Sequence, residues 1–209
     1  VYASGRIEPH HTKGIFIFDG KTGTQLKDVP LSGGGSLYGV WDSHSERFIA
    51  VHEDNRVLLV ESYDAAGARL WQKQFPDSRA SSGPGSQSLV VGADGKTILV
   101  ATTGLRGPSG KVTALSSDGQ PLHETSMQAP RFLKSETRDV GVAWSRSSIW
   151  AYSLLERKVL VEHEIALGGD QGTLVHGISP DGRYIALTRT TGRDRKTATT
   201  TEKPRLVRI

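Results

Sequence analysis

Few residues in this sequence have the types and spacing that chemistry requires, and they are widely separated along the chain. His10 and His11 are the most metal-like pair, but adjacent side chains on an extended segment point in opposite directions. The chain has no cysteine that could complete a set of metal ligands around them. We therefore favour solvated loop histidines, and the sequence predicts no metal site.

The densest basic cluster consists of Arg193, Arg195 and Lys196. Such a cluster could meet a phosphate, an acidic protein patch or an anionic lipid surface. Threonines surround it, so a solvated loop is the simpler interpretation. The candidate partner-binding positions of the chain are His10, His11, Arg106, Arg193, Arg195 and Lys196.

No catalytic motif is present: the sequence has no Gly-x-Ser-x-Gly elbow, no P-loop and no His-Glu-x-x-His. Asp94, Asp118 and Asp181 each precede a glycine, which is typical of aspartates that bond the backbone of a turn. His176 could point into a channel, although a packed or hydrogen-bonded strand histidine is the simpler interpretation. The sequence therefore predicts no catalytic or cofactor-binding residue.

The composition allows a sizeable core and leaves the compartment open. Of 209 residues, 36% are hydrophobic and 24 are glycine, a profile that suits many short strands joined by turns. The chain has no cysteine, so it forms no disulfide bonds. This absence fits either a reducing or an oxidising compartment. No apolar run approaches the ~20 residues of a membrane helix, and no signal peptide is visible at Val1.

The positive charge is confined to one end of the sequence. Residues 183–209 contain eight Lys or Arg against two acids, a net +6, so the remaining residues carry −2 of the overall +4. A nucleic-acid-binding surface would be expected to spread basic residues more widely. We therefore do not expect nucleic acid as the partner.

Residues 174–189, LVHGISPDGRYIALTR, show how the chain is built. Two apolar, β-prone runs flank Ser-Pro-Asp-Gly, in which proline fixes φ and glycine accepts a positive φ, so the pattern predicts a hairpin. Degraded copies recur upstream. The proposed third strands of these units align at Ile15, Val57, Val112, Ile149 and Leu206, which are 42, 55, 37 and 57 residues apart.

A four-stranded unit with a period of roughly 40 to 50 residues predicts an all-β fold, a β-propeller, in which neighbouring blades cover each other's apolar faces. A β-sandwich is the alternative, but it does not explain the fixed order of strands and turns. We expect about five blades near residues 1–31, 36–75, 86–126, 131–165 and 174–209. The first lacks its opening strand and the last its closing strand, so we expect one propeller domain or part of a longer propeller.

Several hairpins resemble known propeller repeats. Residues 178–186 (ISPDGRYIA) resemble the first hairpin of WD-repeat and related bacterial propellers. Three other segments resemble the outer hairpin of quinoprotein-like repeats: residues 15–26 (IFIFDGKTGTQL), 58–71 (LLVESYDAAGARLW) and 112–122 (VTALSSDGQPL). The resemblance implies the propeller fold over nearly the whole chain.

The sequence departs from both families in its tryptophans and cysteines. The Trp41-Asp42 pair lies at a first turn rather than at the end of a third strand, and only Trp71 falls where quinoprotein repeats place a docking tryptophan. No Cys-Cys pair exists, so a quinone cofactor is not implied. We expect Trp41, Trp144 and Trp150 to be core aromatics between blades.

Long connections are predicted to gather on one face. Because strands alternate in direction, the first and third turns of each blade lie on one face, and the second and fourth connections lie on the other. The short turns belong to the first set. The long segments fall almost entirely in the second set: residues 6–13, 32–35, 76–85, 103–110, 168–172 and 190–204. Insertions on one face of a repeat array commonly mark the binding face.

The sequence thus favours a non-catalytic scaffold whose loop-rich face meets a protein partner. The alternative is a propeller enzyme resembling lactonases, glycosidases or quinoprotein dehydrogenases, with a small-molecule site at the channel mouth. That alternative depends on fold analogy alone.

Overall fold

The chain forms an all-β structure in a computed structural model. The structure describes residues 2–7, 12–19, 21–31, 37–81, 88–107, 109–135, 139–145, 147–164, 172–190 and 205–208. Its strands pair into five antiparallel sheets. The strand order follows the chain in four of them, and in the third both β8 and β9 pair with β10.

The first sheet contains β1 (Tyr2–Ile7), β2 (Thr12–Phe18) and β3 (Gln25–Leu31). The second contains β4 (Leu37–Asp42), β5 (Arg47–Asp54), β6 (Val57–Asp64) and β7 (Arg69–Pro76). The third contains β8 (Ser78–Ala80), β9 (Leu89–Val91), β10 (Thr97–Gly104), β11 (Gly110–Ser116) and β12 (Pro121–Ser126). The fourth contains β13 (Arg131–Lys134), β14 (Val140–Trp144), β15 (Ser148–Ser153) and β16 (Lys158–Glu164). The fifth contains β17 (Gly172–Ile178), β18 (Tyr184–Thr190) and β19 (Arg205–Arg208).

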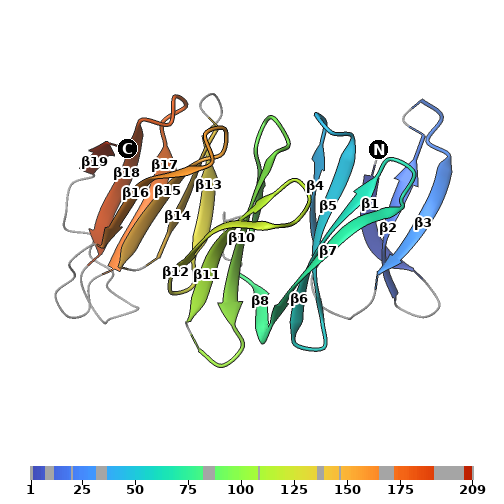
Figure 1. The fold of residues 1–209 in the computed structure, drawn as a ribbon, viewed down its shortest axis with the longest axis horizontal. Helices are drawn as coiled ribbons and strands as arrows, with labels where there is room; N and C mark the ends of the chain where they lie inside the picture. Colours follow the sequence, from blue (N-terminus) through green and yellow to red (C-terminus); the bar gives the residue numbers. More distant parts are fainter. Residues whose placement is uncertain are drawn as a thin grey trace.

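The five sheets stand side by side in chain order, with the first and fifth at opposite ends of the row (Figure 1). The first and fifth sheets have three strands each, and no pairing joins them among the described residues. All five predicted third strands, β2, β6, β11, β15 and β19, occupy the expected position. The expected all-β fold with three fuller and two partial units is confirmed.

The predicted turns form for the predicted reason. Three turn glycines have a positive φ, a conformation that residues with a Cβ atom rarely adopt. The values are 66° for Gly95, 81° for Gly119 and 66° for Gly182. The carboxylate of Asp94 accepts a hydrogen bond from the backbone N–H of Lys96 at 2.9 Å. The carboxylates of Asp118 and Asp181 accept hydrogen bonds within their own turns. These aspartates therefore shape the backbone.

Two predicted loops are shorter than expected. The predicted loop at residues 6–13 is wrong at both ends, because Arg6 pairs with Lys13 and Ile7 with Thr12 in a continued ladder. The predicted loop at residues 76–85 contains β8, which pairs with the end of β10. Three residues, Ser, Arg and Ala, are too few to show the alternation that identifies a strand, so β8 has no signal in the sequence.

At the inner edge of the third sheet, Ala101 of β10 forms backbone hydrogen bonds with two separate segments. The backbone N–H of Ser81 donates to the carbonyl of Ala101 at 3.1 Å, and the N–H of Ala101 donates to the carbonyl of Ser88 at 2.9 Å. The hydroxyl of Ser88 also donates to the carbonyl of Ser81 at 3.0 Å. The ladder therefore continues from β9 to β8, although residues 82–87 intervene in the sequence.

The core consists of four apolar layers, one between each pair of neighbouring sheets. Trp144 and Trp150 are buried in these layers, as predicted. Trp41 is 39% exposed, so its predicted core position is wrong. It lies near the end of β4, an edge strand, which leaves one side of its ring open. Between the first and second sheets the layer consists of Ile15, Ile17, Val29, Phe48, Ala50 and Tyr63.

A buried ion pair joins the second and third sheets at the short-turn face. The Nε of Arg47 lies 3.2 Å from Asp42 Oδ2, and both side chains are buried. The guanidinium also donates to the carbonyls of Gly95 and Ser117 in two turns of the third sheet. Burial raises the pKa of Asp42, but hydrogen bonds from Ser45, His44 and Arg47 outweigh it and lower the pKa. One residue thus fixes the second sheet against two turns of the next.

Trp71 docks on the same turn of the third sheet. Its Nε1 donates to the carbonyl of Ser117 at 2.8 Å. A Cβ on Gly119 would lie 2.7 Å from the Trp71 ring, so only glycine allows this contact. The tryptophan identified from its position in the repeat therefore does contact the neighbouring sheet.

Replacing Arg47 tests the importance of this junction. Arg47→Met leaves Asp42 buried without its cation and removes the hydrogen bond to the Gly95 carbonyl, whereas the Ser117 carbonyl keeps its bond from Trp71, so we expect a loss of about 3–5 kcal/mol in the free energy of unfolding. Arg56→Met is the control, since Arg56 pairs with Asp77 at an exposed position, where the loss should stay below about 1 kcal/mol. Urea unfolding followed by tryptophan fluorescence measures both, and equal losses would contradict the assignment.

Candidate binding face

One of the six predicted partner-binding residues lies in the described structure. Arg106 is exposed in the connection between β10 and β11. The remaining five lie outside the described residues: His10, His11, Arg193, Arg195 and Lys196. The role predicted for all six residues stays a prediction.

Arg106 lines a wide hollow of about 680 Å³ on the face opposite the short turns. The connection from β10 to β11 forms one wall, and the segments leading from β7 into β8 and out of β12 form the others. The lining residues are Asp77, Ser78, Thr102, Gly104, Arg106, Gly107, Ser109, Gly110, Lys111, Ser126, Met127 and Gln128. The lining contains hydroxyls, glycine backbone, the carboxylate of Asp77 and two cations, and much of the surface between them is apolar.

Close backbone packing shapes the wall that carries Arg106. The N–H of Gly104 donates to the carbonyl of Ser109, which closes the connection tightly. A Cβ on Gly110 would collide with the carbonyl of Thr102 and come within 2.9 Å of the carbonyl of Met127. The glycine lets three backbone segments approach one another, which makes this wall compact.

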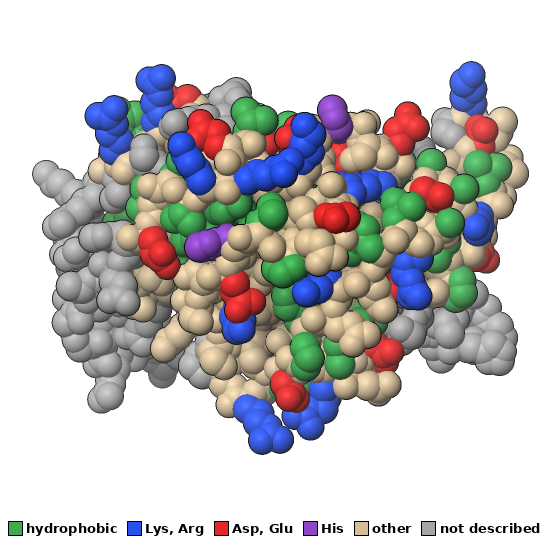
Figure 2. All heavy atoms as spheres, in the orientation of Figure 1, with side chains coloured by type: hydrophobic (Ala, Val, Ile, Leu, Met, Phe, Trp, Pro, Cys, Tyr) green, Lys and Arg blue, Asp and Glu red, His purple; other side chains and the backbone are tan. Residues whose placement is uncertain are grey.

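The charged groups around the hollow differ in whether they already form an ion pair. Lys111 Nζ lies 2.6 Å from Glu124 Oε1, and Arg56 pairs with Asp77 at 2.8 Å. Arg106 has no ion pair among the described residues. Figure 2 shows Lys and Arg side chains projecting at the lower edge, where the β10–β11 connection lies in Figure 1. Among the described residues that line the hollow, Arg106 is thus the cation without an ion-pair partner.

A second hollow, of about 280 Å³, adjoins the first between the third and fourth sheets. Ser126, Met127 and Gln128 line both hollows. Across the second hollow, the hydroxyl of Thr125 donates to Glu162 Oε1 at 2.7 Å. The connection from β12 to β13 is therefore a ridge with a depression on each side.

Behind the second hollow, three ring side chains pack together. Trp150 stacks on Tyr152 with ring centroids 5.1 Å apart and on His123 at 5.9 Å. His123 Nε2, Trp150 Nε1 and the Tyr152 hydroxyl are buried and have no hydrogen-bond partner. Burial raises the pKa of Tyr152. These atoms do not reach the surface, so the cluster supports the ridge through packing.

Comparison with solved structures decides the fold. The Dos1 propeller has a TM-score of 0.51 at 10% identity, over 90% of this chain and 51% of that chain. A eukaryotic initiation factor has a TM-score of 0.52 at 12% identity, over 90% and 48%. TolB from Acinetobacter baumannii has a TM-score of 0.51 at 13% identity, over 99% and 52%. The chain is built of β-propeller blades.

The chain spans about half the length of these propellers. No protein-family model matches the chain, and no curated protein matches it. At these identities the similarity establishes the fold alone.

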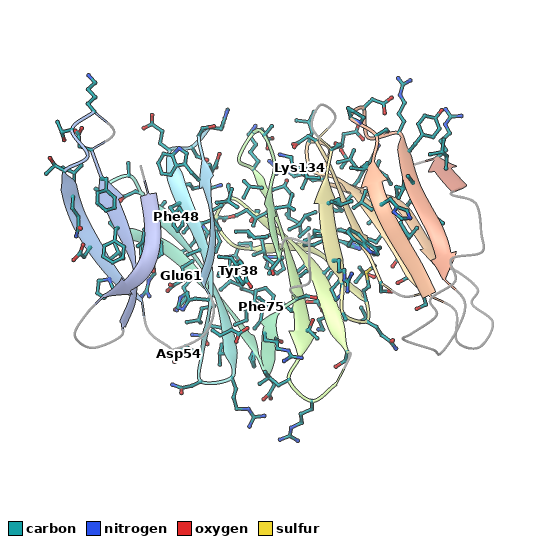
Figure 3. The ribbon with its side chains drawn as sticks, turned by 180° about the vertical axis from the view of Figure 1, so that it is seen from behind. Tyr38, Phe48, Asp54, Glu61, Phe75 and Lys134 are labelled. Carbon is teal, nitrogen blue, oxygen red and sulfur yellow. The ribbon has the colours of Figure 1, made fainter. Side chains whose placement is uncertain are left out.

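The sequence analysis missed a buried polar cluster between the first and second blades. Glu61 is 2% exposed and accepts hydrogen bonds from His52 Nε2 at 2.7 Å, Tyr63 Oη at 2.7 Å, Arg69 Nη1 at 2.9 Å and Gln72 Nε2 at 3.0 Å. Figure 3 places Glu61 between Phe48 and Asp54 along the second blade, toward the first. His52 and Glu61 interrupt otherwise apolar strands, which is the signal that could have revealed them.

This cluster stabilises the blades and leaves no room for a substrate. Four donors occupy the carboxylate of Glu61, so it has no free lone pair for an incoming group. Burial raises its pKa, but the hydrogen bonds from His52, Tyr63 and Arg69 outweigh burial and lower the pKa to about 2. Burial and the bond to Glu61 raise the pKa of Tyr63.

The remaining strand histidines lie apart. His176 is exposed on β17 in the fifth blade, and only the backbone of His163 is described. Within the described ranges, no three His, Asp or Glu residues come close enough to hold a metal ion. The same ranges contain no helix that could cross a bilayer.

The Glu61 cluster predicts a specific acid response. Because the folded pKa of Glu61 is about 2 against an ordinary 4.5, its stabilisation is complete above about pH 4.5 and is lost as the pH falls toward 2. The loss should approach about 3 kcal/mol. Glu61→Gln should remove this pH dependence and lower stability at neutral pH. Urea unfolding at several pH values measures it.

Glu124→Gln is the control for that experiment, since Glu124 is exposed and pairs with Lys111 at the surface. It should retain the acid response of the unmodified chain. An unchanged pH dependence in Glu61→Gln would show that other carboxylates cause the acid sensitivity.

Proposed function

We propose that this chain is a non-catalytic propeller module that presents its loop-side face to a protein partner. The observation that carries the proposal is the hollow beside Arg106, which is wide, open and lined by hydroxyls and glycine backbone. An extended segment of a partner could lie in it and bond its walls, as peptide segments do in other recognition grooves.

The charge at the hollow favours an acidic segment. Arg106 offers a planar, fully charged guanidinium without a competing carboxylate among the described residues. Lys111 lies in the same lining and is half exposed beside Glu124. Charge-assisted hydrogen bonds to a carboxylate are stronger than neutral ones and fix its orientation. We therefore expect aspartate or glutamate in the bound segment.

The blades supply the rigidity that such a site needs. β10 and β11 carry the walls of the hollow, and nearly all of β10 is buried between neighbouring blades. A preorganised surface loses little conformational entropy on binding. A propeller enzyme with its site at the channel mouth remains the alternative, and it too remains a prediction.

Photocrosslinking from the face itself tests the proposal. A photoreactive amino acid in place of Ser109, which is exposed in the wall of the hollow, should crosslink a specific protein in extracts of the source cells. Arg106→Glu should reduce the yield of that crosslinked protein by about tenfold, since an acidic segment would then be repelled.

Lys96→Glu is the matched control, because Lys96 is exposed in a short turn on the opposite face. The crosslinked protein should be retained in this variant. Equal yields from the unmodified chain and Arg106→Glu, or loss only in Lys96→Glu, would contradict a binding site at the hollow.

A further inference from the structure

The second hollow differs from the first in the charge of its lining. Glu162 is the charged residue in its described lining, and this residue is exposed. The hydroxyl of Thr125 donates to Glu162 Oε1, and among the described residues no cation lies within ion-pair distance of this carboxylate. In the first hollow the group without an ion-pair partner is a cation, Arg106. Adjacent hollows on the loop-side face thus carry opposite charges that the described residues do not neutralise.

The size and polarity of the second hollow indicate what it can receive. Its volume of about 280 Å³ is just below the roughly 300–1,000 Å³ that is typical of small-molecule pockets. It therefore suits a single long side chain better than a separate ligand. Besides Glu162, its lining supplies the hydroxyls of Ser147 and Ser148 and the amide of Gln128, all of which can accept hydrogen bonds. An ammonium or guanidinium group donates hydrogen bonds and accepts none, so this lining fits a basic side chain.

The ridge between the two hollows is fixed to the neighbouring segments. The backbone N–H of Met127 donates to the carbonyl of Gly110 at 3.0 Å. At the other end of the ridge, the hydroxyl of Ser81 donates to the carbonyl of Pro130. Ala129 has a φ of 43°, in the left-handed region that residues with a Cβ atom rarely adopt. Such a conformation persists where the surroundings impose it, so the ridge holds the two hollows at a set separation.

An extended segment has the geometry to reach both hollows. Every second side chain of an extended chain points to the same side, and each residue advances the chain by about 3.3 Å. A segment that lies across the ridge therefore directs alternate side chains toward this face. Two residues separated by an even number of positions can enter the two hollows together.

We propose that the partner segment crosses this ridge, with an acidic side chain against Arg106 in the first hollow and a basic side chain against Glu162 in the second. This inference rests on the proposed function, and it adds the sequence chemistry of the partner. The two charges also set the direction in which the segment runs. A segment with the opposite order of charges would place like charges together, which disfavours its binding.

Photocrosslinking from both hollows tests the crossing. Ser109 and Ser147 are exposed in the walls of the first and second hollows, respectively. A photoreactive amino acid at either position should crosslink the same protein in extracts of the source cells. Mass spectrometry should place the two crosslinked sites within one segment, with an acidic residue near the first site and a basic residue near the second.

Charge reversal at Glu162 tests the second contact with that segment made as a fluorescent peptide. Glu162→Lys should raise the dissociation constant of the peptide by about tenfold, as measured by fluorescence anisotropy. A peptide whose basic residue is replaced by glutamate should bind Glu162→Lys more tightly than it binds the unmodified chain, because the reversed pair attracts again.

Glu46→Lys is the matched control, since Glu46 is exposed in a short turn on the opposite face. It should bind the peptide like the unmodified chain, and circular dichroism checks that every variant is folded. Unchanged affinity in Glu162→Lys, with weaker binding in Arg106→Glu, overturns the crossing and leaves the proposed function standing. Crosslinks from Ser109 and Ser147 to different proteins do the same. If no crosslinked protein depends on Arg106, both proposals are overturned.

Discussion

Each sheet of this protein has two faces, and a four-stranded antiparallel sheet cannot bury either face by itself. The neighbouring sheets must do so, which makes the apolar layers between blades the main source of stability. Val142 in β14 and Trp150 in β15 lie in different layers, although their strands are adjacent. The order of the blades therefore follows from which faces can meet.

Polar contacts set how the blades sit on these layers. The Arg47 guanidinium and the Trp71 indole both bond the carbonyl of Ser117, one from an inner and one from an outer strand of the second blade. The hydrophobic effect is non-directional, whereas hydrogen bonds to fixed carbonyls are directional. The turn at Ser117 thus acts as a reference point for the angle between the second and third blades.

The sequence contained much of the fold because turn chemistry and strand alternation are local. Asp94, Asp181 and the glycines after them shape their turns through hydrogen bonds within the turn and through positive φ. The site depends on strand register and on how segments approach one another, which one sequence does not reveal. The four donors to Glu61 are near it in sequence, but the register of β5, β6 and β7 brings them to one carboxylate. The wall at Gly110 forms because Thr102 and Met127 approach it. Arg106 became a candidate because it lies in one of the long connections that were predicted to gather on one face.

The divided inner edge of the third blade has a consequence for how this protein can change. Ser81 and Ser88 are both anchored to Ala101, so strand register is set on either side independently of the spacer between them. Additions or deletions there need not shift any side chain from one face of the sheet to the other. Evolution, or a protein engineer, therefore has a position at which peptide length can vary while the propeller scaffold stays the same.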